Sequence, residues 1–123
     1  MTQTLSQKVF ESALRELKDP RGRQAQFLGI HARSKGQAMT MKRLAEKVGY
    51  RSWRGMNLQY GILARDIGLA AGMSFSNLPD PNIMLLVDFV PPVRKSSENI
   101  SNSEYILVMK EPFMKALKAV GWI

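Results

Sequence analysis

The chain has 123 residues, of which 45% are hydrophobic, so its size and composition fit one globular domain with a single core. It has no cysteine, which excludes disulfides, thiolate metal sites and a cysteine nucleophile. With a single histidine, His31, it has almost no residues from which a histidine-based metal cluster or a Ser/His/Asp triad could be built. No apolar run reaches the roughly 18 residues of a membrane span, and no secretory signal is evident. We therefore expect a cytoplasmic protein without metal, cofactor or membrane contact, in which His31 is merely packed or on a helix surface.

The charge of the chain is unevenly distributed. Eighteen basic against ten acidic residues give a net charge of +8. Eight basic and two acidic residues fall between Ala32 and Asp66, so three quarters of the excess lie in that segment. Concentrated positive charge favours a polyanionic partner, because binding releases counterions, and it points first to a nucleic acid. A solvated basic face without a partner is the alternative.

Two helices are predicted within residues 1–36. Thr4 begins a capping box, and apolar residues then recur at helical spacing until Asp19. Asp19 is placed to cap the second helix with Pro20 in its first position, and Gly36 marks the end of that helix.

A helix-turn-helix-like core is predicted over residues 38–72. Thr40 is placed to cap a short helix that Gly49 ends, and Ser52 to cap a longer one that begins at Trp53. Two helices joined by so short a glycine-containing turn are typical of the helix-turn-helix. The inward stripe of the short helix is predicted to be Met41, Leu44, Ala45 and Val48.

A β-hairpin is predicted over residues 83–110, with apolar β-branched runs at 84–90 and 105–109 around a long polar tip. Asp88, inside the first run, is expected to face outward. Pro112 begins a C-terminal helix over residues 112–122.

The predicted fold class is therefore mostly α, within α+β. One domain, residues 1–123, contains a helix-turn-helix-like helical core, a β-hairpin in the position of the wing of a winged helix, and a C-terminal helix that is an addition to that plan.

The longer helix of the core carries one apolar and one polar face. On a helical wheel, the buried face is predicted to be Met56, Tyr60, Leu63, Ile67 and Ala70. The opposite face carries Arg54, Asn57, Gly61 and Arg65.

That polar face suits a DNA groove. Arginine can donate two hydrogen bonds to a guanine edge, and asparagine can pair with an adenine edge. The alternative leaves Arg54 and Arg65 solvated and Asn57 bonded locally. For Gly61 we favour packing against a neighbouring helix over close approach of a ligand. Trp53 is expected to pack at the edge of the core rather than stack on a base.

Other basic residues are candidates for phosphate contacts, which give affinity without sequence information. They are Lys42, Arg43 and Lys47 on the short helix, Arg51 in the turn, and Arg94 and Lys95 in the hairpin tip.

The stretch MTMKRLAEKVGYRSWRGMNLQYGILARDIG, with the NLQYG segment at residues 57–61 as its most distinctive part, resembles a helix-turn-helix-like module of bacterial restriction-type proteins. In those proteins the module often precedes an HNH nuclease domain. The ending is similar too, from Val108-Met109 through Pro112 to Gly121-Trp122. The resemblance implies a DNA-binding module; with no cysteine and one histidine, an HNH site cannot be built here, so nuclease activity does not carry over.

Three functions follow in order of support. The first is binding of double-stranded DNA. The second is a small phage or mobile-element inhibitor or adaptor that docks on a protein of a nucleic-acid-processing or defence complex, for which an exposed apolar anchor would be the sign. The candidates are Leu58, Ile62 and Leu69, although packing on the first two helices is favoured for them. An enzyme has the least support, because the acidic residues show no paired spacing. The sequence leaves open DNA versus RNA and monomer versus homodimer.

Overall fold

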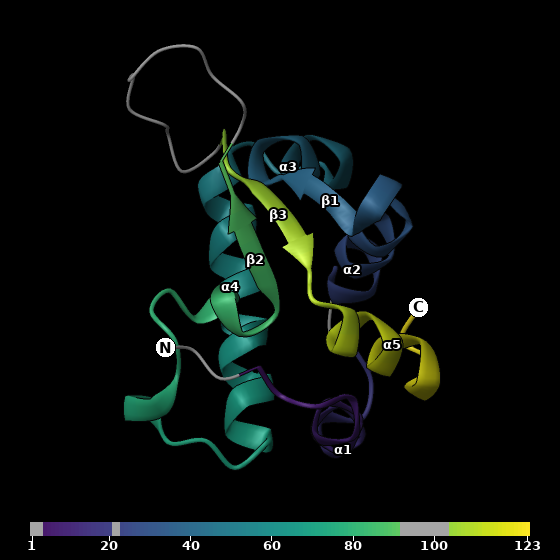
Figure 1. Ribbon diagram of the computed structural model, residues 1–123. Coiled ribbons are helices and arrows are strands. Elements are labelled where there is room, and N and C mark those ends of the chain that lie inside the picture. Colours follow the sequence, from purple (N-terminus) through teal and green to yellow (C-terminus); the bar gives the residue numbers. More distant parts are fainter. Residues whose placement is uncertain (1–3, 21–22, 92–103) are drawn as a thin grey trace.

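The computed structural model describes residues 4–20, 23–91 and 104–123, in which helices predominate (Figure 1). The elements in chain order are α1 (Gln7–Leu17), α2 (Gln24–Arg33), β1 (Ala38–Thr40), α3 (Met41–Val48), α4 (Trp53–Ala70), β2 (Val87–Val90), β3 (Ile106–Met109) and α5 (Glu111–Val120). The predicted fold class is confirmed, with a helix-turn-helix core, a β-hairpin and a C-terminal helix.

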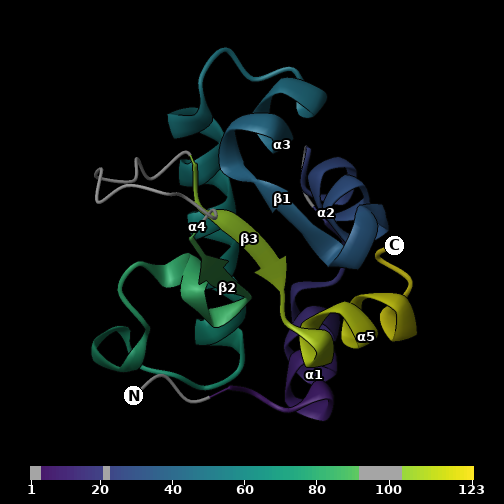
Figure 2. The same cartoon turned by 45° about the horizontal axis from the view of Figure 1, so that its top comes forward.

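The three strands form one antiparallel sheet in the order β1-β3-β2, which Figure 2 shows with β3 in the middle. Leu107 of β3 lies opposite Phe89 of β2 and Met39 of β1. The pairing of β2 with β3 confirms the hairpin, whereas β1 was not predicted, because three residues are too few to show a period of two. The order α2, β1, α3, α4, β2, β3 is that of a winged helix.

The first two helices begin later than predicted. The hydroxyl of Ser6, not of Thr4, caps α1 by accepting a hydrogen bond of 3.2 Å from the third backbone N–H beyond it. Serine ranks above threonine as an N-cap residue, which agrees with the later start of α1. α2 begins at Gln24 without a side-chain cap, instead of at Asp19 and Pro20. A capping signal is local, and tertiary packing of the apolar residues that follow decides where the helix starts.

The first strand of the hairpin is shorter than predicted. Asn82–Leu85 form a 3-10 helix, and β2 starts only at Val87. Short apolar runs do not distinguish a buried strand from a buried helical turn, which explains the error. Asp88 is exposed on β2, as expected.

His31 connects three elements in the middle of the core. Its side chain is completely buried; Nε2 lies 2.8 Å from the carbonyl oxygen of Leu107 on β3, and Nδ1 lies 2.9 Å from the hydroxyl of Tyr60 on α4. Since a carbonyl can only accept, Nε2–H is the donor and Nδ1 accepts from the tyrosine. The neutral imidazole is thereby fully satisfied, and the packed role expected for His31 is confirmed.

α1 and α5 close the core at the end of the molecule away from α3 (Figure 1). The rings of Phe10 and Phe113 stack at a centroid distance of 5.3 Å between these two helices. The indole Nε1–H of Trp122 donates a hydrogen bond of 3.0 Å to the carbonyl of Lys18. No helix among the described residues has the length and apolar character to cross a membrane.

We predict that the protein loses stability as the pH falls through the range in which free histidine titrates. Burial lowers the pKa of His31 from its ordinary value of 6.5, and the hydrogen bond to the Leu107 carbonyl opposes this only in part. Below pH 6.5 the unfolded chain therefore binds a proton that the folded core excludes, and the free energy of unfolding should fall by up to about 1.4 kcal/mol per pH unit.

Urea unfolding at several pH values between about 7.5 and 5.5 measures this slope. His31→Gln, whose amide can donate to Leu107 and accept from Tyr60, is the control and should flatten it. An equal slope in both proteins would contradict the assignment.

Two glycines of α4 are predicted to respond in opposite ways to alanine. A Cβ at Gly61 would meet no atom within 4 Å, so the expected packing of Gly61 against a neighbouring helix is wrong. Gly61→Ala should therefore stabilise the protein by about 0.5–1 kcal/mol through helix propensity alone. A Cβ at Gly68 would overlap the side chain of Leu78 and lie 3.2 Å from Leu85, so Gly68→Ala should lower the melting temperature. Equal melting temperatures for the two variants would refute this description of α4.

Candidate nucleic-acid interface

α3 separates a buried face from a basic one, as the sequence predicts. The hydroxyl of Thr40 caps the helix by accepting a hydrogen bond of 3.1 Å from the backbone N–H of Arg43, and Gly49 ends it in the left-handed conformation at φ 94°. The predicted inward stripe is confirmed, since Met41, Leu44, Ala45 and Val48 are all buried. The cations on the other face, Lys42, Arg43 and Lys47, are exposed.

The turn before α4 and the first turn of α4 each add one more cation beside this face. Arg51 is exposed, and the guanidinium of Arg54 lies over the ring of Trp53 at 5.0 Å from its centroid. Trp53 is half-buried against the core, as expected, and so offers Arg54 a fixed surface. Ser52 occupies the N-cap position, but its hydroxyl accepts no hydrogen bond from the helix, so the predicted side-chain cap is absent.

α4 buries the face that the helical wheel predicts. Met56, Tyr60, Leu63 and Ile67 are buried, Ala70 is half-buried, and Asn57 is exposed. The polar side chains at the start of α4 therefore face away from the core, next to α3.

Arg65 is not part of this group. Its guanidinium is paired with the carboxylate of the adjacent Asp66, with an N–O distance of 3.2 Å. It also lies eight residues beyond Asn57, or about 12 Å along the helix axis. The helical wheel correctly predicted the side of α4 on which Arg65 lies. A wheel does not show the distance between two residues along the helix axis, nor the charge of an adjacent residue. We remove Arg65 from the candidate interface.

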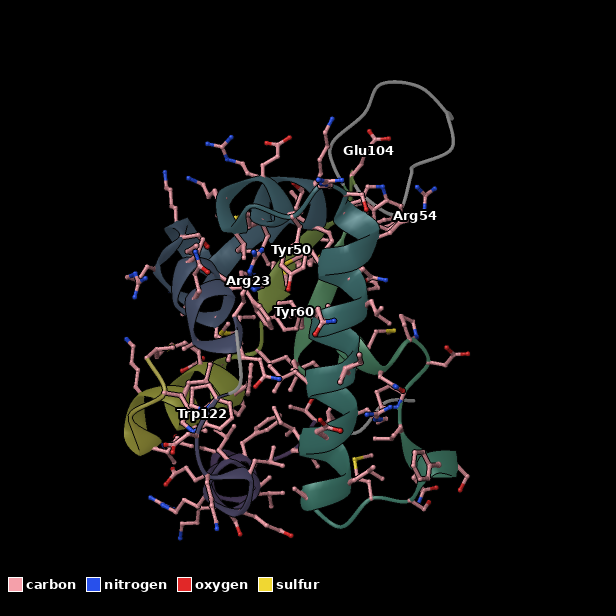
Figure 3. The ribbon with its side chains drawn as sticks, turned by 180° about the vertical axis from the view of Figure 1, so that it is seen from behind. Arg23, Tyr50, Arg54, Tyr60, Glu104 and Trp122 are labelled. Carbon is pink, nitrogen blue, oxygen red and sulfur yellow. The ribbon has the colours of Figure 1, made fainter. Side chains whose placement is uncertain are left out.

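We call the five remaining described cations, Lys42, Arg43, Lys47, Arg51 and Arg54, the basic end. Within the described part of the chain, none of the five forms an ion pair, whereas the cations at positions 15, 65, 110 and 115 do. α3 lies at one end of the molecule, and Figure 3 shows Arg54 at that end and Trp122 toward the other. Arg94 and Lys95 lie outside the described residues.

A contact that the sequence analysis missed holds the basic end in place. The guanidinium of Arg23, at the start of α2, lies 5.0 Å from the ring centroid of Tyr50 and donates a hydrogen bond of 3.5 Å to the carbonyl of Val48 (Figure 3). Arg23 is 25 residues from Val48 and 27 from Tyr50 in the sequence, so no local pattern could have revealed this contact. It attaches α2 to the turn between α3 and α4.

One large apolar side chain of α4 is not covered. Leu58 is 60% exposed, so the expectation that it packs on the first helices is wrong. Ile62 and Leu69 are half-buried: Ile62 lines a depression beside Phe27 of α2, and Leu69 one beside Leu17 of α1. Leu58 instead lines a shallow depression with Pro81, Asn82 and Ile83.

A cavity of about 380 Å³ opens between α3, α4 and the hairpin. We call it the aromatic cavity, and its lining residues are Met41, Asn57, Pro81, Phe89, Tyr105 and Leu107. The rings of Phe89 and Tyr105 are 6.1 Å apart, centroid to centroid.

Among the described residues, no three histidine, aspartate or glutamate side chains gather closely enough to hold a metal ion. Comparisons of the chain with protein-family models, with curated protein sequences and with solved structures gave no match.

Proposed function

We propose that the protein binds double-stranded DNA through the basic end and has no catalytic role. The observation that carries this proposal is the gathering of five exposed cations without described acidic partners on the two helices of a helix-turn-helix. Cations held without counter-charges on a rigid surface attract a polyanion and release its counterions.

In this proposal the two helices have different tasks. Lys42, Arg43, Lys47 and Arg51 contact phosphates and position the protein. Arg54 and Asn57, at the start of α4, face a groove, where arginine suits a guanine edge and asparagine an adenine edge. Arg94 and Lys95 add contacts from the chain between β2 and β3. We expect a protein with this function to act in the cytoplasm.

A second candidate function is supported by the exposure of Leu58. A large apolar side chain that is 60% exposed beside a basic surface is the kind of anchor that protein interfaces use. The protein would then be an inhibitor or adaptor that docks on an acidic surface of a nucleic-acid-processing complex. It would bind DNA weakly and its partner through Leu58.

We predict that replacing Lys42, Arg43 and Lys47 together by glutamine weakens DNA binding and flattens its salt dependence. Each phosphate contact contributes about 0.9 to the slope of log K against log salt, so the slope should fall by about 2.7. Fluorescence anisotropy of a labelled random duplex across a salt series measures it.

The matched control removes three cations from the other end, Lys8, Lys115 and Lys118, which lie exposed on α1 and α5. Its slope should stay within about 1 of the wild-type value, since only long-range charge is lost. Equal losses in both triple variants would mean that net charge alone drives binding. No binding by the wild type even at low salt would contradict the proposal and favour the protein partner.

A further inference from the structure

The aromatic cavity lies where the basic end meets the hairpin. Met41, in its lining, is the first residue of α3 and precedes Lys42. Asn57, also in the lining, is one helical turn beyond Arg54. Phe89 and Leu107 are paired across β2 and β3 and complete the wall on the sheet side. A nucleic acid held by the basic end would therefore lie next to this cavity.

The lining combines ring surfaces with one polar group. Phe89 and Tyr105 are both half-buried, so each ring is in part accessible, and Met41, Pro81 and Leu107 add apolar surface. The carboxamide of Asn57 is exposed and has no hydrogen-bond partner among the described residues. It can donate two hydrogen bonds and accept others in one plane. Aromatic and apolar walls with a single free amide fit a flat, heterocyclic ligand.

We propose that the aromatic cavity takes a single nucleobase that has left the duplex stack, an inference that rests on the proposed function. Proteins that hold such a base stack it between aromatic or apolar side chains and bond its pairing edge. Here Phe89 and Tyr105 supply the stacking surface. The amide of Asn57 then bonds the pairing edge of the unstacked base inside the cavity, in place of a base edge in the groove, which leaves the groove to Arg54. Stacking and these hydrogen bonds offset the cost of unpairing. The neighbouring cations favour this occupant over an apolar peptide.

The test compares two labelled duplexes that differ at one position: a central adenine is opposite thymine in one and opposite an abasic site in the other. The unpaired adenine needs no unpairing, so the wild type should bind that duplex at least about tenfold more tightly by anisotropy. Asn57→Ala and Phe89→Leu should each reduce the preference toward equal affinity. Gln59→Ala, two residues further on α4 and outside the cavity lining, should keep it.

Each outcome decides between the two proposals. Binding of neither duplex overturns both the proposed function and this inference. Equal binding of the two duplexes overturns the inference alone and leaves the cavity to an apolar side chain of a protein partner. A preference that persists in Asn57→Ala also overturns it, since the preference then comes from the flexibility of the duplex. Asn57 is exposed, so this variant tests the inference even if the half-buried Phe89→Leu fails to fold.

Discussion

The hydrogen bonds of His31 are the interaction on which the arrangement of this fold depends. One imidazole reaches the hydroxyl of Tyr60 on α4 and the carbonyl of Leu107 on β3, while its own backbone belongs to α2. A buried polar group that lost either partner would cost about 1–3 kcal/mol, so the helical layer and the central strand are fixed in one relative position. The lone histidine of the chain is thus a structural residue that is held neutral.

The basic end follows from that arrangement. β1 leads directly into α3, and β1 pairs with the same central strand that His31 contacts. The cations of α3 are therefore carried by a short helix that is held on one side by β1 of the sheet and on the other by α4, and Arg51 lies in the turn that joins the two helices. Arg23 strengthens this hold by lying over Tyr50 in the turn. A surface fixed in this way loses little conformational freedom on binding a ligand.

Local signals in the sequence predicted the elements that form the site. Thr40 and Gly49 bound α3 because capping and the left-handed turn depend on the residue itself. β1 escaped prediction because its only signal is a partner almost 70 residues away. The predicted groove contact of Arg65 and the predicted packing of Leu58 were not supported, since Arg65 is paired with the adjacent Asp66 and Leu58 is 60% exposed. A helical wheel records only the direction of each side chain, so it contains neither the charge of an adjacent residue nor the segments that pack on the helix.

The central claim is that DNA binds at the end of the molecule formed by α3 and the start of α4. Titration of the ¹⁵N-labelled protein with a short duplex, followed by amide chemical shifts, tests it most directly. The account predicts shifts or broadening in α3, in residues 49–52 and in the first turns of α4, with α1 and α5 unchanged. Shifts confined to α1 and α5, or none at low salt, would contradict it.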